Sequence, residues 1–289
     1  ADTAQWWNRR RGIAVAVCAS GNYLAGAFWP PIVQWGVEHH GWRDTYQMLG
    51  LVCGGGMLLL SWAFRTRPPK TLPTPAGAQI SLTSWASDTP LGLPRRRALG
   101  LLSVAGVACC VAMSMPQVHI VAYCTDLGFG PARGAEMLSL MLASGIVSRL
   151  VSGYICDRIG GLRTLLLGSM LQGTALLLFL PFDGLAALYV ASALFGLFQG
   201  GIVPSYAIIV REYFPPAHAG VQTGTVIMAT LLGMALGGWM SGAIFDATGS
   251  YKAAFVNGIA WNLLNLAIAT YFFRRARVLG QLRRAGSTH

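Results

Sequence analysis

Apolar runs long enough to cross a lipid bilayer recur along almost the whole of this chain. A membrane-spanning helix needs about 20 mostly apolar residues, and eight segments of the sequence meet that requirement. Only 11% of the 289 residues are charged, whereas soluble domains carry about 25%, so the chain could not cover a water-facing surface. The sequence therefore predicts an all-α membrane protein with eight transmembrane helices at residues 12–35, 46–64, 98–123, 136–155, 164–180, 185–210, 221–245 and 253–273.

The basic residues fall almost entirely on one side of the predicted membrane. When the segments between the helices are assigned alternately to two sides, 17 of the 21 Lys and Arg residues lie on the side that holds both chain ends, and 3 lie on the other. The remaining one, Arg149, lies inside the fourth helix. Because loops rich in Lys and Arg stay in the cytoplasm, we expect both termini to be cytoplasmic. We expect a multi-pass protein of the inner (plasma) membrane of a bacterial cell.

A polar stretch with six prolines separates the second helix from the third. It has no apolar periodicity and carries six basic residues, which is typical of a cytoplasmic linker. The chain then divides into residues 1–64 with two helices, a central linker at 65–97, a six-helix unit at 98–273 and a basic tail at 274–289. Six helices after a long basic loop indicate one half of a twelve-helix protein.

The composition also bears on other classes of protein. The net charge of +11 is carried at the ends of apolar segments, where it sets membrane orientation, so we expect no nucleic-acid partner. The six cysteines show no Cys-x-x-Cys pair and no His at metal-ligand spacing, so we expect no metal and no cofactor. Four of the five His lie in loops or at the terminus, away from any reactive constellation, so an enzyme is not expected.

The turn after the fourth helix carries the most specific motif. Residues 153–163 read GYICDRIGGLR, which resembles the loop motif G-x-x-x-D-R-x-G-[RK]-[RK] of the major facilitator superfamily. An acid at the helix end can pair with the basic residues, and the glycines permit a tight turn into the next helix. The departure is Gly161, where the family has a basic residue. The resemblance assigns a role in conformational change to Gly153, Asp157, Arg158, Gly160 and Arg163.

Residues 10–43 are similar to the fifth helix and following outer loop of one branch of this superfamily. That branch includes the monocarboxylate transporters and the bacterial oxalate–formate exchangers. The resemblance implies a twelve-helix fold in two halves. The eight helices here correspond to helices 5–12 of that fold, so we expect the first four to be missing from an N-terminally truncated chain. We also expect that the chain alone does not transport.

Arg149 is the residue on which the functional hypothesis rests. An Arg at the centre of a spanning helix costs about 2.5–3.5 kcal/mol on the insertion scale, so it has to face the bundle interior or a water-filled pathway. Gly145 and Gly153 lie four residues away on either side, on the same helical face. The guanidinium presents a fixed fork of donors that suits a carboxylate. Snorkelling to the interface, or a structural pair with a buried acid or carbonyl, remains the alternative.

The resemblance adds to this hypothesis and also limits it. Monocarboxylate transporters carry an Arg at this place in the eighth helix, implicated in substrate binding, and often an Asp one turn earlier. That earlier position is Gly145 here, which puts proton coupling through it in doubt. Oxalate exchangers add a Lys in the eleventh helix, and residues 221–245 contain no basic residue. A monocarboxylate is therefore favoured over a dicarboxylate.

Further polar side chains could line the same pathway or bridge helices. His119 could relay protons, with Gln117 and Tyr123 beside it in the third helix. The other predicted substrate-binding residues are Gln199, Asn257 and Asn22, and weaker candidates are Tyr23, Gln172, Gln222, Asn262 and Asn265.

The function predicted from the sequence is secondary active transport of a small organic anion by alternating access. Its partners would be the lipid bilayer, the anion, and a proton or counter-anion as the coupling ion. Two alternatives stay open: an exporter of drug-like or other small solutes on the same fold, in which Arg149 is structural, and a membrane sensor that does not transport.

Overall fold

The computed structural model describes residues 11–63, 90–215 and 218–286, and this part of the chain is helical throughout, without strands. Most of the predicted linker lies outside the described residues. The elements are α2 (Arg11–His40), α3 (Trp42–Ala63), the short 3₁₀ helix η1 (Pro90–Gly92), α5 (Arg95–Asp126), α6 (Pro131–Ile159), α7 (Gly161–Leu178), α8 (Leu185–Gln199), α9 (Ile202–Tyr213), α10 (Ala219–Thr248) and α11 (Tyr251–Gly286).

Helices are found at all eight predicted positions, and most extend a few residues beyond the predicted bounds, with two larger differences. The sixth predicted helix is divided at Gly200 and Gly201 into α8 and α9. The last helix does not end at Phe273 but continues as α11 to Gly286, because the tail is rich in Leu and Arg, which are good helix formers. The basic tail is thus a helical extension within the described residues.

Within the described ranges, six segments are long and apolar enough to cross a membrane. They are α5, α6, α7, the pair α8–α9, α10, and α11 as far as Leu279. The fold class predicted from the sequence is confirmed. Spanning by α2 and α3 stays a prediction.

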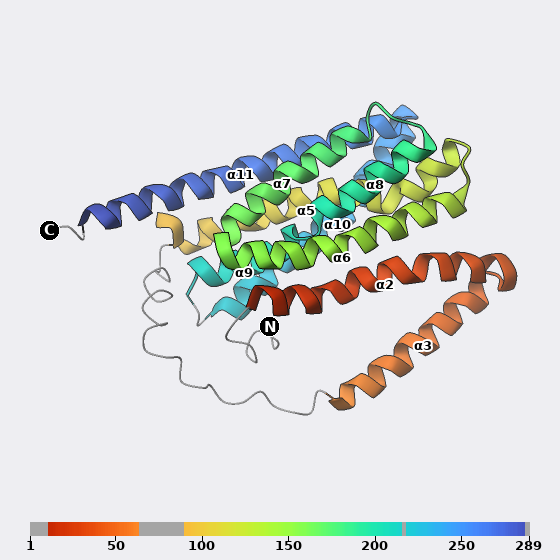
Figure 1. Ribbon diagram of the computed structural model, residues 1–289, viewed down its shortest axis with the longest axis horizontal. Helices are drawn as coiled ribbons and strands as arrows, with labels where there is room; N and C mark the ends of the chain where they lie inside the picture. Colours follow the sequence, from red (N-terminus) through yellow and green to blue (C-terminus); the bar gives the residue numbers. More distant parts are fainter. Residues whose placement is uncertain (1–10, 64–89, 216–217, 287–289) are drawn as a thin grey trace.

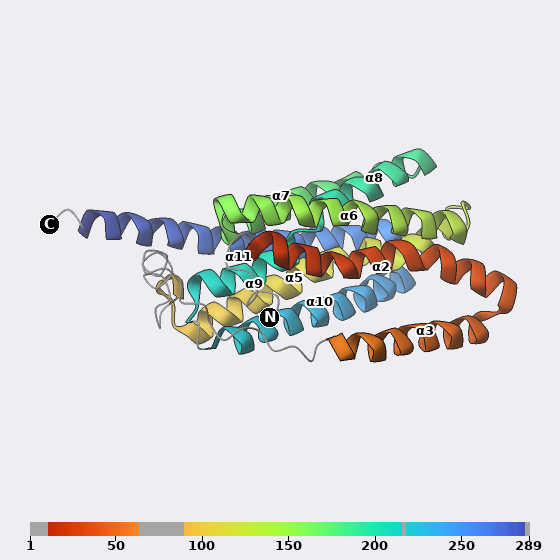
Figure 2. The same cartoon turned by 60° about the horizontal axis from the view of Figure 1, so that its bottom comes forward.

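The helices from α5 to α11 form an elongated bundle, and α2 lies along α6 on its surface (Figures 1 and 2). The connections α2–α3, α5–α6, α7–α8 and α10–α11 gather at one end. The start of α2, the α6–α7 turn and the end of α11 lie at the other (Figure 1). This alternation is the one that the sequence predicted from its basic residues.

Helix α3 turns back from α2 and stands apart from the bundle (Figure 2). The turn is made at Gly41, whose φ of +80° suits glycine, and Gly36 leaves room for the side chain of Thr45 beside it. Leu51 and Leu59 are 77% and 78% exposed. Such an apolar surface requires lipid or further helices as its neighbour.

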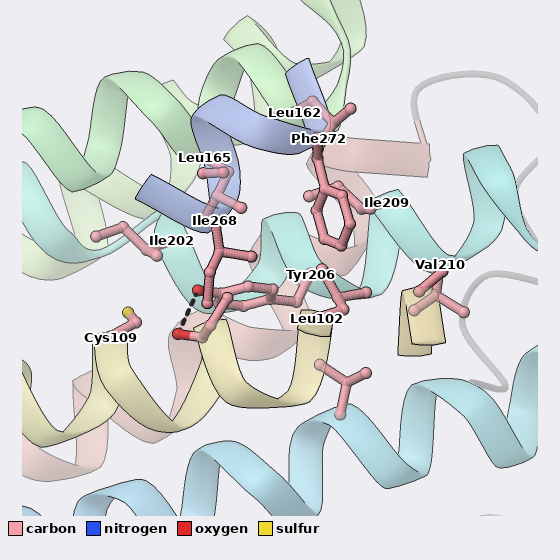
Figure 3. Close-up of a cluster of buried hydrophobic side chains, with 14 of the residues drawn as sticks. Leu102, Cys109, Leu162, Leu165, Ile202, Tyr206, Ile209, Val210, Ile268 and Phe272 are labelled. Carbon is pink, nitrogen blue, oxygen red and sulfur yellow. Dashed lines mark hydrogen bonds between the residues drawn. The ribbon is translucent and has the colours of Figure 1, made fainter. Parts of the chain in front are cut away.

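Two apolar cores hold the bundle together. The first lies toward the α6–α7 turn and is built from α5, α7, α9 and α11; Figure 3 shows Leu102, Leu165, Ile209 and Phe272 meeting there. The second lies toward the opposite end, where the rings of Phe179 and Phe255 stack at 4.9 Å.

A chain of buried polar contacts crosses the bundle between these cores. The hydroxyl of Tyr206 donates to the backbone oxygen of Ala105 at 3.0 Å (Figure 3) and to Asn265 Oδ1 at 2.8 Å. Asn265 Nδ2 donates to Ser169 Oγ at 2.8 Å. One turn away, Asn262 Nδ2 donates to Gln172 Oε1 at 3.0 Å, and Gln172 Nε2 donates to the Cys109 carbonyl at 3.3 Å. These bonds join α5, α7, α9 and α11, so Gln172, Asn262 and Asn265 bridge helices.

Candidate functional site: an arginine between α2 and α6

Arg149 is buried at the contact between α2 and α6. Its side chain is 7% exposed, and its guanidinium carbon lies 3.7 Å from the centroid of the Tyr23 ring. Tyr23 belongs to α2 and is itself 5% exposed. A guanidinium over an aromatic face is stabilised by about 0.5–2 kcal/mol. The inward orientation predicted for Arg149 is therefore found, and its aromatic neighbour comes from the part of the chain before the linker.

Gly145 makes the room that this arrangement needs. A Cβ atom there would lie 2.8 Å from both Cδ2 and Cε2 of Tyr23, too close for any side chain without movement of the ring. The position where the resembling family often has an Asp is here filled by the edge of Tyr23. The Tyr23 ring that contacts Arg149 occupies the space that a side chain at position 145 would need, so this position carries no carboxyl group.

A neighbouring face of this part of α6 packs closely on the α8–α9 junction. A Cβ on Gly196 would overlap the Met141 carbonyl, and a Cβ on Gly200 would lie 2.5 Å from the Gly145 carbonyl and 2.8 Å from Ser148 Cβ. Small residues at such spacing let two backbones touch. Arg149, next to Ser148 in sequence, is therefore carried by a helix clamped on two sides.

Gln199 lies at that junction and is fully buried. Both Oε1 and Nε2 of its amide lack a hydrogen-bond partner among the described residues. A buried amide without hydrogen-bond partners lowers the stability of the fold by about 1–3 kcal/mol. A polar ligand group that hydrogen-bonds to Gln199 would recover that free energy. Of the candidates predicted beside Arg149, Gln199 has the environment that best fits a ligand contact. Gln222, at the start of α10, is also buried, and its Oε1 has no hydrogen-bond partner among the described residues.

The candidates in α5 lie far along the bundle from the α6–α7 turn and contact neighbouring helices. The Nε2 atom of His119 lies 2.9 Å from the Gly238 carbonyl of α10. The hydroxyl of Tyr123 donates to Asp183 Oδ1 at 2.8 Å. Gln117 is half-buried, and its Nε2 has no partner within the described part of the chain.

Asp183 belongs to the loop between α7 and α8 and links three elements. Besides Tyr123 it accepts a hydrogen bond from Lys252 Nζ at 2.9 Å. Lys252, first, and then the Tyr123 hydroxyl hold the pKa of the Asp183 carboxyl below its ordinary value, because both interactions favour the charged form. These contacts tie α5, the loop and the start of α11 together.

The two predicted asparagine ligands lie elsewhere on the molecule. Asn257 is half-buried on α11, and Asn22 is exposed on α2, next to Tyr23 in sequence. Within the described part of the chain, no group of three side chains that could ligate a metal is formed.

The predicted loop motif forms a tight turn between α6 and α7. Gly160 has φ of +85° and ψ of 164°, and its N–H donates to the Cys156 carbonyl at 2.9 Å. Gly153 is buried in the last turns of α6, while Asp157, Arg158 and Arg163 are exposed. The guanidinium of Arg158 lies 4.3 Å from the centroid of the Tyr154 ring.

Glu212 of α9 contacts this turn, and the sequence did not single it out. Its carboxylate oxygens lie 3.0 and 3.1 Å from the backbone nitrogen of Gly161, the first residue of α7. A Cβ on Gly161 would lie 2.9 Å from Ile209 Cγ1. Gly161, where the resembling motif has a basic residue, is therefore required by the close packing of α9.

Two overlapping stretches of the chain, residues 3–185 and 137–287, match the model of the family described as the Major Facilitator Superfamily. Among similar proteins, monocarboxylate transporter 13 of Bos taurus is 29% identical over 259 residues, which cover 88% of this chain and 58% of that protein. The MFS-type transporter pynF of Aspergillus niger is 25% identical over 272 residues, covering 93% of this chain and 60% of that protein. The chain spans about three fifths of the length of these relatives.

A solved structure has the same fold. The crystal structure of the fucose:proton symporter of E. coli superposes with a TM-score of 0.64 at 14% sequence identity. The alignment covers 91% of this chain and 68% of that chain.

Proposed function

Since this chain belongs to the Major Facilitator Superfamily, we propose that it serves secondary active transport of a small organic anion, a monocarboxylate, by alternating access. Membership of a family of transporters confirms that the chain is a membrane protein and not an enzyme. The similarity to proteins named monocarboxylate transporters favours this substrate class. The observation that carries the proposal is the buried Arg149.

The guanidinium of Arg149 has the chemistry to select a carboxylate. Its planar fork can donate two parallel N–H bonds to the two carboxylate oxygens, and in a low-dielectric site such bonds are stronger than in water. The ring of Tyr23 stabilises the positive charge when no anion is bound. A carboxylate arriving over the guanidinium would replace or complement that ring, and the amide of Gln199 would bind a further polar group of the solute.

The position of Arg149 also suits alternating access. In this fold the two halves rock about a central site. Tyr23 comes from the helices before the linker and Arg149 from those after it, so the contact between them joins the two parts that move. Anion binding at Arg149 would change the interaction across this boundary, which gives the substrate a differential affinity for the two conformations, as any coupled transport requires.

The coupling ion in this proposal is a proton or a counter-anion. Gly145 offers no carboxyl group beside Arg149, so a proton would have to be carried elsewhere or by the solute itself. We place the chain in the inner (plasma) membrane with both termini cytoplasmic, on the strength of the basic residues in the loops at one end of the bundle.

The test is uptake of labelled L-lactate by proteoliposomes that contain the whole protein. Arg149→Ala should lower uptake by roughly 10- to 150-fold, which corresponds to about 1.5–3 kcal/mol for a charge-assisted hydrogen-bonded contact. Arg149→Lys should keep the charge but raise KM, because the fork is lost. Arg133→Ala is the matched control, since Arg133 forms an exposed pair with Glu136 at 3.0 Å.

Undiminished uptake in both Arg149 variants would contradict the role assigned to Arg149. If excess unlabelled monocarboxylates fail to compete in the unaltered protein, the substrate class is wrong, and export of a drug-like solute with a structural Arg149 becomes the better explanation. Imposing a proton gradient, or loading the vesicles with a counter-anion, then distinguishes the two modes of coupling.

A further inference from the structure

A cavity of about 450 Å³ opens at the end of the bundle where α6 turns into α7. Its walls come from the end of α6, from α7, from the end of α9 and from the last turns of α11. On α11 it is lined by Phe273, Ala276, Arg277 and Gln281, which recur at the spacing of one helical face. The apolar run of α11 ends at Phe273, before Arg274, Arg275 and Arg277, so the cavity lies where the membrane-spanning part of the bundle meets water.

The lining contains both apolar and basic residues. Leu162, Phe273 and Ala276 provide the apolar part. Arg163 of α7 and Arg277 of α11 provide two guanidinium groups, both from exposed side chains. The guanidinium carbon of Arg277 lies 4.9 Å from the centroid of the Phe273 ring, so the positive charge stands beside an apolar residue of the lining.

The carboxylate of Glu212 lies beside this cavity and already accepts hydrogen bonds. Glu212 precedes Tyr213, a lining residue, but both of its oxygens accept hydrogen bonds from Gly161 N–H. Neither lining arginine has an ion pair to a carboxylate among the described residues. The residues that line the cavity thus carry two positive charges and no negative one, with the hydrogen-bonded Glu212 carboxylate beside them, and the Tyr213 hydroxyl and the Gln281 amide offer additional donors.

We propose that this cavity binds the phosphate headgroup of an anionic lipid. Two arginines from different helices suit the oxygens of one phosphate, because guanidinium and phosphate form bidentate charge-assisted bonds. The adjoining apolar wall suits the glycerol and the first part of an acyl chain, which a free anion would leave in contact with water. Anionic lipids gather in the cytoplasmic leaflet, the side on which the basic residues place this end of the bundle.

A lipid held in this way would connect α7 to α11 at the conformational loop. Gly160 and Arg163 belong both to the loop motif and to the cavity lining. Occupancy would therefore bias the position of the α6–α7 turn relative to the extension of α11. The proposal concerns binding at a site separate from Arg149 and does not depend on the identity of the transported solute.

The test measures lipid binding to the full-length protein by native mass spectrometry after delipidation in detergent. Phosphatidylglycerol and phosphatidylcholine are titrated separately, and inorganic phosphate is added as a competitor. We expect phosphatidylglycerol to bind at least tenfold more tightly than phosphatidylcholine, and Arg277→Gln to remove about tenfold of that affinity. Arg277→Lys should retain part of it.

Arg275→Gln is the matched control because it removes the same charge from the same helix. Arg275 donates to the Tyr271 hydroxyl at 3.0 Å and does not line the cavity, so its loss should change the affinity less than twofold. Equal losses in Arg275→Gln and Arg277→Gln would overturn the proposal, since diffuse charge would explain both. Equal affinity for the two lipids would overturn it as well. Displacement of the lipid by inorganic phosphate at a similar concentration would overturn the lipid assignment in favour of a free anion.

Discussion

The carboxylate of Glu212 binds the backbone N–H of Gly161 with both of its oxygens, at 3.0 and 3.1 Å, across 51 residues of sequence. The first N–H groups of a helix have no partner within the helix, and the helix dipole places partial positive charge there. Glu212 therefore caps α7 from another helix. The bond fixes the end of α9 against the turn that carries the conformational loop motif.

Removing the negative charge of this cap should destabilise the bundle. Glu212→Gln keeps the size and one acceptor but loses the charge, so we expect a loss of about 1–2 kcal/mol. Thermal unfolding of the full-length protein in detergent measures it as a lower Tm. Glu136→Gln, at an exposed ion pair, is the control and should change Tm little. Equal shifts in the two variants would show that the cap does not contribute.

A side chain at Gly161 should be as harmful as the loss of its partner. In Gly161→Ala the new Cβ would lie 2.9 Å from Ile209 Cγ1 and 3.2 Å from the Ile209 backbone nitrogen, and such overpacking costs about 1–3 kcal/mol. Gly224→Ala is the control, because nothing lies within 4 Å of a Cβ there. In the interior of α10 that change should stabilise by up to about 1 kcal/mol. The two variants should thus shift Tm in opposite directions, and a rise in both would refute the packing argument.

The ring of Tyr23 should matter more than its hydroxyl. Tyr23→Phe keeps the aromatic face over Arg149, so stability and lactate uptake should stay close to those of the unaltered protein. Tyr23→Leu removes the face and should cost about 0.5–2 kcal/mol, seen as a lower Tm and weaker uptake. Combining Tyr23→Leu with Arg149→Leu in a double-mutant cycle measures the coupling. Additive effects in that cycle would mean that the contact has no energetic weight.

The buried hydrogen bonds of the Tyr206 hydroxyl should contribute measurably to the free energy of unfolding. Tyr206→Phe leaves Asn265 Oδ1 and the Ala105 carbonyl without the donor they share. Hydrogen bonds between membrane helices average about 0.6 kcal/mol, and two are lost together, so we expect about 1–2 kcal/mol. Tyr46→Phe, at an exposed ring of α3, should be neutral in the same unfolding assay. A neutral Tyr206→Phe would indicate that the two acceptors find other donors.

The Asp183 contacts predict an acid-sensitive contribution. Lys252 and Tyr123 lower the pKa of Asp183 in the folded protein, so the stabilisation is present above the unfolded value of about 4 and is lost as the pH falls through the folded pKa. Because the side chains of Asp183 and Lys252 are 43% and 50% exposed, their ion pair should contribute less than about 1 kcal/mol to the free energy of unfolding.

The measurement is the difference in Tm between the unaltered protein and Asp183→Asn from pH 8 to pH 3. This difference should be constant down to about pH 5 and shrink below about pH 4. Lys252→Met should weaken the same acid dependence, since it removes the larger cause of the lowered pKa. A difference that grows toward low pH would have the wrong sign for a lowered pKa.

The helices and the burial of Arg149 could be predicted from the sequence because both depend on local composition. The apolar runs and the alternation of basic loops need no knowledge of which helices touch. The same holds for the inward face of α6, which follows from Gly145 and Gly153 on either side of Arg149. The division of α8 from α9 had a local signal too, in the adjacent Gly200 and Gly201.

The contacts between distant residues could not be predicted in this way. Tyr123 and His119 were proposed as ligands from their polarity, whereas the structure joins them to Asp183 and Gly238, which lie 60 and 119 residues away. Glu212 gave no signal because a single acid at the end of a helix is unremarkable until its partner is known. Tyr23 was only one weak candidate among several, because nothing local relates it to Gly145.

The interruption at Gly200 and Gly201 has a consequence for how the protein reaches the membrane. A break in the helical ladder leaves backbone groups that lipid cannot hydrogen-bond, and here Gly145, Ser148 and Ser152 of α6 lie directly against the break. The segment formed by α8 and α9 is therefore shielded only once α6 is in place beside it. Substitutions that push these helices apart should first appear as failed insertion and degradation of the newly made chain, before any defect in solute movement can be measured.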